Sequence, residues 1–362
     1  MEFGLKKLRK LTVAIIKNRV VMTSKINVSV LISLVFFVYG CQGVVNRKVT
    51  PDSLETRMRQ VLLIALEDEN PLLRVHALES LAQLATLDVI PKIRSRLYDP
   101  IPAVQFAAAI AVGDVKDYAS ENLLQRLLAS QNVSVQLAAG YALEKLGDQR
   151  FADWYDKVLF GSDEKLAGQA CMLLGKLGNT TGRTDSPEKL WKVLRASKQL
   201  PNVQLQAAEA LARLGDESIL DELLIFTNSL YASDKILAIS GLQHIGGTDV
   251  FAVLTGLTDD PQIEVRLAAV RALGDLAEKD HIQFVRESLR YSDPDDDSVS
   301  TIRVRSLALL ALGNVGGQKD GSLLFDAMDS ASRGYVKVAA ARAAIDYIKR
   351  MRKAAASEQL YK

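Results

Sequence analysis

Cysteine, histidine and aromatic residues are scarce in this sequence. Its 362 residues include two cysteines and three histidines, and Phe, Trp and Tyr together make up 6% of the chain. The histidines, His76, His244 and His281, stand far apart and have no carboxylate at a spacing that would bind a metal. HExxH, C-x-x-C and a glycine loop before lysine and serine are all absent. The sequence therefore indicates no catalytic centre, metal site or cofactor, and we predict that the protein is not an enzyme.

A strong charge of either sign is also absent, because the formal net charge is only +2. This balance averages two unlike parts. Residues 1–40 carry seven Lys or Arg and one acid, which leaves 38 basic and 42 acidic residues in the remainder. A mildly acidic body exerts no general attraction on the phosphates of nucleic acid. We therefore expect no nucleic-acid partner, and no small-molecule substrate is evident from the sequence.

The apolar run near the N-terminus is too short to span a membrane. It covers about 11 residues from Val28 to Val38, whereas a membrane-spanning helix needs roughly 20. The run follows a basic leader and ends in VYGC at Cys41, which is typical of an export signal. Translation from Met22 instead of Met1 would leave an ordinary short signal.

The end of this run resembles the lipobox of bacterial lipoproteins, although Tyr39 is bulkier than is usual in that family. The resemblance implies that residues 1–40 are removed as a signal peptide and that Cys41 is lipidated. Residues 41–50 would then tether the body to a membrane. By analogy with enteric bacteria, Gln42 favours the outer membrane, facing the periplasm. The alternatives are an ordinary secretory signal with an incidental cysteine, or an uncleaved short anchor.

From residue 51 onward the sequence repeats itself. With Val265 in DPQIEVRLAAVRALGDLA as the anchor, an equivalent position occurs nine times, and five of the eight steps are 31 residues long. The anchors are Leu73, Val104, Val135, Leu166, Val203, Asp234, Val265, Val304 and Val336. An alanine stands four residues after every anchor. Nine alanines in phase indicate the buried stripe of a helix that packs closely against neighbours of the same kind.

A second helix fits into each period, for example at Asp88–Leu97 or Ser120–Leu128. Helix pairs at this spacing, with the pattern D-P-x-x-x-V-R-x-x-A-A-x-A-L-G-x-L, resemble HEAT repeats of the short bacterial class related to phycobilisome lyases. The resemblance covers residues 51–352, before a polar tail at residues 353–362. It implies an all-α, right-handed α-solenoid of about nine helix pairs. We expect an elongated array, on the order of 80 to 90 Å along its axis.

Two other features could carry a function. Cys171 could be a catalytic thiol, and the acidic loop SDPDDDS could bind calcium. Cys171 lies five residues after Leu166, where other repeats have core residues, so we expect a buried thiol without a catalytic role. The loop contains four acids between Asp293 and Asp297, which could supply oxygen ligands for calcium. It lacks the spacing, the central Gly and the closing Glu of an EF-hand, so we expect a solvated loop, with calcium binding as the alternative.

The positions six and ten residues after each anchor turn away from the core, at about 100° per residue. The sixth is apolar in three adjacent repeats, at Ile110, Tyr141 and Met172. In HEAT proteins this helix lines the concave face, so we expect an apolar strip with a basic edge that binds a protein or peptide. The predicted binding residues are Ile110, Tyr141, Met172, Lys145, Lys176 and Arg213. The alternative is that tight curvature buries the apolar side chains between repeats.

The predicted function is a membrane-tethered HEAT-repeat scaffold or adaptor that binds protein or peptide partners in the bacterial envelope. The alternative is a HEAT-like enzyme of the bilin-lyase or DNA-glycosylase type. Export and the mildly acidic body argue against DNA. A lyase would need a nucleophile or an acid–base cluster, and the sequence shows neither.

Overall fold

The computed structural model describes residues 49–151, 154–178, 184–196, 200–293, 298–330 and 334–360. These residues belong to a single compact unit. The predicted signal peptide and lipidated Cys41 lie outside the described residues. Among the residues described, no helix is both long enough and apolar enough to cross a membrane.

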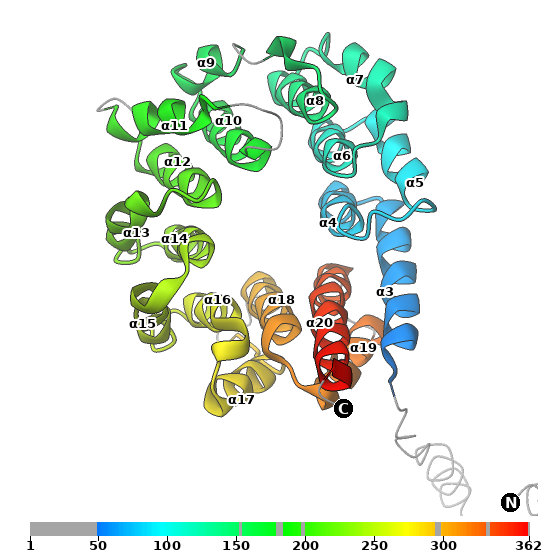
Figure 1. Ribbon diagram of the computed structural model, residues 1–362. Helices are drawn as coiled ribbons and strands as arrows, with labels where there is room; N and C mark the ends of the chain where they lie inside the picture. Colours follow the sequence, from blue (N-terminus) through cyan, green and yellow to red (C-terminus); the bar gives the residue numbers. More distant parts are fainter. Residues whose placement is uncertain are drawn as a thin grey trace, which may run out of the picture. The chain divides into compact units, whose positions relative to one another are not determined.

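Each repeat consists of an outer helix followed by an inner helix (Figure 1). The inner helices are α4 (Pro71–Leu81), α6 (Pro102–Asp114), α8 (Val133–Lys145), α10 (Glu164–Leu177), α12 (Pro201–Arg213), α14 (Ala232–Ile245), α16 (Ile263–Leu273), α18 (Ser298–Val315) and α20 (Gly334–Leu360). The outer helices are α3 (Pro51–Leu66), α5 (Ile90–Ser95), α7 (Glu121–Leu127), α9 (Trp154–Leu159), α11 (Ser186–Arg195), α13 (Leu220–Phe226), α15 (Gly247–Leu257), α17 (Lys279–Ser288) and α19 (Gly321–Asp329). The described residues therefore confirm an all-helical solenoid of nine helix pairs.

Small residues set the spacing of the inner helices. All nine alanines that follow the anchors by four residues have no exposed surface. Two glycines allow still closer contact: a Cβ added to Gly113 would lie 2.8 Å from Ala142 Cα, and one added to Gly175 would lie 2.8 Å from Ala210 Cβ. Neighbouring inner helices therefore touch almost backbone to backbone, and the larger Leu, Val and Ile side chains fill the space toward the outer helices.

Buried ion pairs join successive repeats. Arg74 on α4 donates two hydrogen bonds of 2.9 Å to Asp99, in the turn before α6. Lys235 on α14 contacts Asp260, in the turn before α16, at 2.6 Å. In each pair an inner helix is tied to the turn that begins the next repeat. Such pairs contribute little net stability because burial costs each charge its hydration, but breaking one leaves an uncompensated buried charge.

The array closes on itself, which differs from the elongated array expected from the repeat pattern. The last inner helix, α20, packs against α18 on one side and against α3 and α4 on the other (Figure 1). Leu54 and Met58 of α3 share one hydrophobic core with Ile345 and Ile348 of α20. Solenoid ends usually need polar capping faces. Here each end covers the apolar face of the other instead.

Ion pairs reinforce this closing contact. Arg57 of α3 reaches Asp329 at the end of α19, with 2.6 Å between Nε and Oδ1. Arg352 of α20 contacts Glu55 of α3 at 2.7 Å. The basic end of α20 therefore contributes to closure of the ring.

The C-terminal boundary also differs from the predicted one. Helix α20 continues to Leu360, so residues 353–360 extend the helix instead of forming a separate tail. Earlier in α20, Arg350 contacts Asp275 of the seventh repeat at 2.8 Å. Helix α20 therefore connects repeats on both sides of it.

Candidate functional site

A cavity of about 740 Å³ opens on the inner face of the ring. Its size lies within the range of roughly 300 to 1,000 Å³ that is usual for ligand sites. One wall is apolar: Leu72 and Val75 come from α4, Phe106 and Ile110 from α6, and Met172 from α10. The repeats bring these residues together because each inner helix presents the same face to the interior of the ring.

The lining of the cavity also includes a set of basic side chains, which we call its basic wall. Lys165 and Lys176 come from α10, Arg213 ends α12, and Arg342 reaches in from α20. Two acids, Glu79 and Asp114, also line the cavity, so cations are in excess. The cavity therefore combines an apolar wall with a positively charged one, and it includes residues from both ends of the repeat array.

The structure corrects one member of the predicted apolar strip. Tyr141 is completely buried, and its hydroxyl donates a hydrogen bond to Asp114. Burial and the neighbouring Asp114 carboxylate raise the pKa of Tyr141, because both disfavour its ionised form. The ring fits beside Gly113, which has no side chain to exclude it. The alternative of burial between repeats therefore holds at this position.

The other predicted residues lie at or near the cavity. Ile110, Met172, Lys176 and Arg213 line it. Lys145 is half-buried and is outside the lining. Burial and repulsion from nearby lysines lower the pKa of Lys145. The structure thus brings four of the six predicted residues to one surface.

Ion pairs and hydrogen bonds between side chains continue from the cavity along the inner helices. Lys176 contacts Asp114 at 2.9 Å. Arg213 donates to the buried Glu209, which also accepts a 3.2 Å hydrogen bond from Ser240 Oγ. Glu209 is thus paired with a cation of its own repeat, and Asp114 with a cation two repeats further along. These carboxylates keep the basic side chains in place at the cavity wall.

Several lining residues were missed from the sequence. Phe106, Lys165 and Gln169 lie close to their anchors, at positions that the columns six and ten residues on do not include. Extending the same helical period backward places residues one before and three after each anchor on the inner face. Comparison of those two columns across the repeats would have found Lys165 and Gln169. Arg342 stands in the column six residues after its anchor, Val336, but the sequence could not place it beside α4 and α6, because it reaches this cavity only through ring closure.

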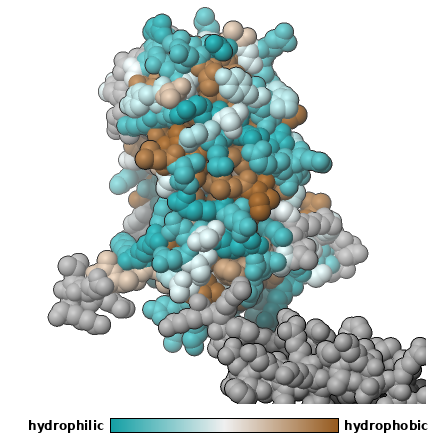
Figure 2. Space-filling model, turned by 90° about the vertical axis from the view of Figure 1, so that its right-hand side faces the viewer, coloured by the Kyte–Doolittle hydropathy of each residue, from teal (hydrophilic) through white to brown (hydrophobic). Residues whose placement is uncertain are grey.

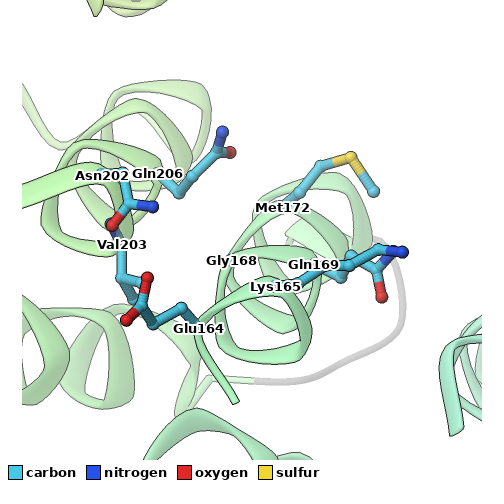
Figure 3. A pocket seen from close by; sticks show the side chains of 8 residues that line it. All are labelled: Glu164, Lys165, Gly168, Gln169, Met172, Asn202, Val203 and Gln206. Atoms are coloured by element: carbon cyan, nitrogen blue, oxygen red, sulfur yellow. The ribbon is translucent and has the colours of Figure 1, made fainter. Parts of the chain in front are cut away.

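A smaller cavity of about 240 Å³ adjoins the first between α10 and α12 (Figure 3). The two share Lys165, Gln169 and Met172. Asn202 and Gln206 of α12 line the other side of the smaller cavity. Its polar lining consists mainly of carboxamides, which can both donate and accept hydrogen bonds.

The outer surface offers a weaker candidate. Figure 2 shows apolar groups gathered among hydrophilic ones on the side of the ring that carries α3. A shallow depression on α3 is lined by Leu63, Ile64 and three acids, Glu67, Asp68 and Glu69. It lacks the converging walls and the cations of the central cavity. The central cavity is therefore the better candidate for a binding site.

The other candidates from the sequence have these places in the structure. Cys171 is buried, and burial raises the pKa of its thiol to about 12, so the thiol is protonated at neutral pH. In the part of the chain that the structure describes, no three His, Cys, Asp or Glu side chains are grouped to hold a metal ion. Of the four acids in the acidic loop, only Asp293 is among the described residues, so the expected solvated loop stays a prediction.

Comparison with known proteins supports the repeat family. The family model for HEAT repeats matches residues 59–144 and 221–302. Human deoxyhypusine hydroxylase in complex with glycerol is similar at 19% identity and a TM-score of 0.37, covering 81% of this chain and 96% of that one. The complex of CpcE and CpcF of phycocyanin lyase from Nostoc is similar at 16% identity and a TM-score of 0.30, covering 81% of this chain and 94% of that one. Among curated proteins none matches this sequence.

These structural neighbours correct the prediction that the chain is not an enzyme. That prediction was wrong as a conclusion from the fold, because a hydroxylase and a lyase are among the similar structures. At these identities and TM-scores the likeness concerns the fold and assigns no reaction to this chain. The repeated helix pairs, the buried alanines in phase and the family match agree, and the chain is a HEAT-repeat protein.

Proposed function

We propose that this protein is a scaffold that holds a peptide segment of a partner protein in its central cavity, the segment carrying apolar anchors and at least one carboxylate. The observation that carries the proposal is the pairing of an apolar wall with a basic wall in one cavity of ligand size. Neither wall alone would indicate a class of partner. Together they select for an amphipathic, anionic segment.

The two walls would contribute to binding in different ways. Burying one Leu or Phe side chain of the partner against Phe106 and Ile110 would contribute about 1.5 to 3 kcal/mol. A carboxylate near Lys165, which is exposed at the cavity wall, would form charge-assisted hydrogen bonds, which are stronger than neutral ones. Apolar contact would thus supply most of the affinity, and charge would favour acidic partners over basic ones.

The basic wall offers the cleanest test. A random peptide library displayed on phage, selected on the purified protein, should enrich sequences that place Leu, Ile or Phe beside Asp or Glu. The enriched peptide should bind Lys165→Glu at least tenfold more weakly, a loss of about 1.4 kcal/mol, because the substitution repels its carboxylate. Lys157→Glu on the outer helix α9 is the matched control, because its side chain is exposed away from the cavity lining.

The apolar wall is tested with the same peptide. Phe106→Glu should abolish binding, whereas Phe160→Glu, at an exposed position following α9, should leave it unchanged. The melting temperature of each variant is measured in parallel to separate loss of binding from loss of fold. Failure to enrich any peptide consensus, together with binding of dodecanoate that Phe106→Glu abolishes, would point to a lipid occupant and contradict the proposal.

We propose that the scaffold is tethered to a membrane by a lipid on Cys41, as the lipobox resemblance implies. Residues 42–50 would hold the body within about 30 Å of the bilayer, at roughly 3.3 Å per extended residue. Mass spectrometry of the detergent-extracted protein should find a mature N-terminus at a lipid-modified Cys41. The Cys41→Ser variant should lose this modification, and an unmodified N-terminus upstream of Cys41 in the wild-type protein would contradict the tether.

A further inference from the structure

We propose that the central cavity continues into a backbone-binding subsite at Gly168, where the main chain of the bound peptide crosses α10 in an extended conformation. The inference rests on the proposed peptide-binding function and adds how the peptide is held. The larger cavity would take the side chains of the peptide. The smaller cavity between α10 and α12 would hold its backbone.

Gly168 is the first observation. It lies inside α10, where glycine is less favourable than alanine because it leaves the unfolded backbone more freedom. Packing does not require it: a Cβ added there would meet only Gln206 Cγ, at an ordinary 3.6 Å. Gly175 in the same helix contrasts with it, because a Cβ there would collide with Ala210. A helix glycine that packing does not explain often marks the close approach of another backbone.

The carboxamides around Gly168 are the second observation. Gln169, Asn202 and Gln206 line the small cavity together (Figure 3). Gln169 Oε1, on the side of α10 that faces the larger cavity, is buried and accepts no hydrogen bond from any residue that the structure describes. Asn202 uses its oxygen to accept from Val203 N at 2.8 Å, which leaves its NH₂ group as a donor. One acceptor and further donors at a bare stretch of helix match the alternating N–H and C=O groups of an extended peptide.

The position of the subsite suggests the direction of the peptide. Figure 3 shows Lys165, Gln169 and Met172 pointing away from α12, whereas Glu164 extends toward it. The first three also line the larger cavity, where the cations are in excess. A peptide crossing at Gly168 would therefore place its carboxylate-bearing part among those cations. The other part of the peptide would lie near Glu164.

Gly168→Leu is the decisive variant. The new side chain would fill the crossing point without contacting other backbone, so the protein should fold normally. It should weaken binding of the peptide enriched on phage at least tenfold. Gly256→Leu is the matched control: Gly256 lies in the outer helix α15, and an added Cβ there meets nothing within 4 Å. Its affinity for the peptide should equal that of the wild-type protein.

Backbone recognition is tested with synthetic copies of the enriched peptide, each N-methylated at one successive position. Methylation removes one N–H donor and leaves every side chain unchanged. Methylation at one or two of the positions should lower the affinity of the peptide for the wild-type protein at least tenfold. Equal binding of all N-methylated copies would overturn the backbone role.

The variants also separate this inference from the function on which it rests. If Gly168→Leu binds as well as wild type while Lys165→Glu still weakens binding, the subsite is wrong and the peptide-binding cavity stands. If neither substitution changes binding, or if no peptide is enriched, both proposals fail. Loss of binding in Gly168→Leu, with a melting temperature no lower than that of the wild type, supports the subsite.

Discussion

At the scale of single residues, glycines in one helix serve different purposes. Gly175 is required because its neighbour Ala210 leaves no room for a side chain, whereas Gly168 faces a cavity. Sequence inspection cannot separate the two, since both are glycines within the same predicted helix. The difference comes from the position of α12, which packs over one and stands away from the other.

This difference predicts that substitution by alanine has opposite effects on stability at the two positions. Gly168→Ala should stabilise the protein by about 0.5 to 1 kcal/mol, because the helix gains a better helix former without a clash. Gly175→Ala should destabilise it by about 1 to 3 kcal/mol through overpacking against Ala210. Urea unfolding of the two variants and the wild type measures both changes. Destabilisation by Gly168→Ala would contradict the open space assigned to this position.

Two histidines should give opposite pH dependences. Burial and the Arg213 guanidinium lower the pKa of His244, whereas the hydrogen bond and charge of Glu79 raise the pKa of His76. A lowered pKa means that the unfolded chain binds the proton first, so His244 reduces stability as pH falls below about 6.5. A raised pKa stabilises the folded state at low pH, and this contribution disappears as pH rises through the folded pKa.

The prediction is measured with His244→Gln and His76→Gln in urea at pH 8 and pH 5.5. Relative to the wild type, His244→Gln should lose less stability on acidification. His76→Gln should lose more. Equal pH dependence in all three proteins would show that neither imidazole changes its pKa on folding.

At the scale of elements, the sequence predicts where helices begin. It does not show that a residue capping one helix also bonds to a helix far along the chain. Thr50 caps the first helix, α3, with a capping box to Ser53. Asn70 caps α4 through a 3.0 Å hydrogen bond from Leu72 N. Its amide also donates to Tyr335 Oη on α20, at 2.8 Å. One residue therefore begins a helix and contributes to closing the ring.

Asn70→Ala should therefore lower the free energy of unfolding more than the loss of an ordinary helix cap does. Loss of the cap alone costs about 1 kcal/mol, and loss of a closing hydrogen bond adds about 1 kcal/mol. Asn132→Ala is the control, because Asn132 caps α8 through Val135 N at 3.2 Å and lies away from the closing contact. Tyr335→Phe removes the closing bond and keeps the cap. Equal free energies of unfolding for the two asparagine variants would contradict the added role.

At the scale of the whole molecule, closure determines what the protein can bind. The basic wall of the cavity includes Arg342 from the last helix, and the apolar wall includes Leu72 from the first inner helix. An open array would hold these residues apart. The binding surface therefore depends on a contact between the two ends of the solenoid.

Substitutions in the ion pair between Arg57 of α3 and Asp329 of α19 test this closure. Arg57→Asp would place two carboxylates together at the seam and should lower stability by about 1 kcal/mol, with faster hydrogen exchange in α20. The double variant Arg57→Asp with Asp329→Arg restores opposite charges and should recover most of the loss. Additive losses in the double variant would show that the pair does not act across the seam.

Repeat number, helix type and the buried alanine column could all be read from the sequence, because they depend on periodicity within about thirty residues. Ring closure, the burial of Tyr141 and the joining of Leu72 with Arg342 in one cavity could not. They depend on the small rotation between successive repeats, summed over all nine. A local pattern specifies which face of each helix is apolar. Only the assembled ring decides which of those faces meet.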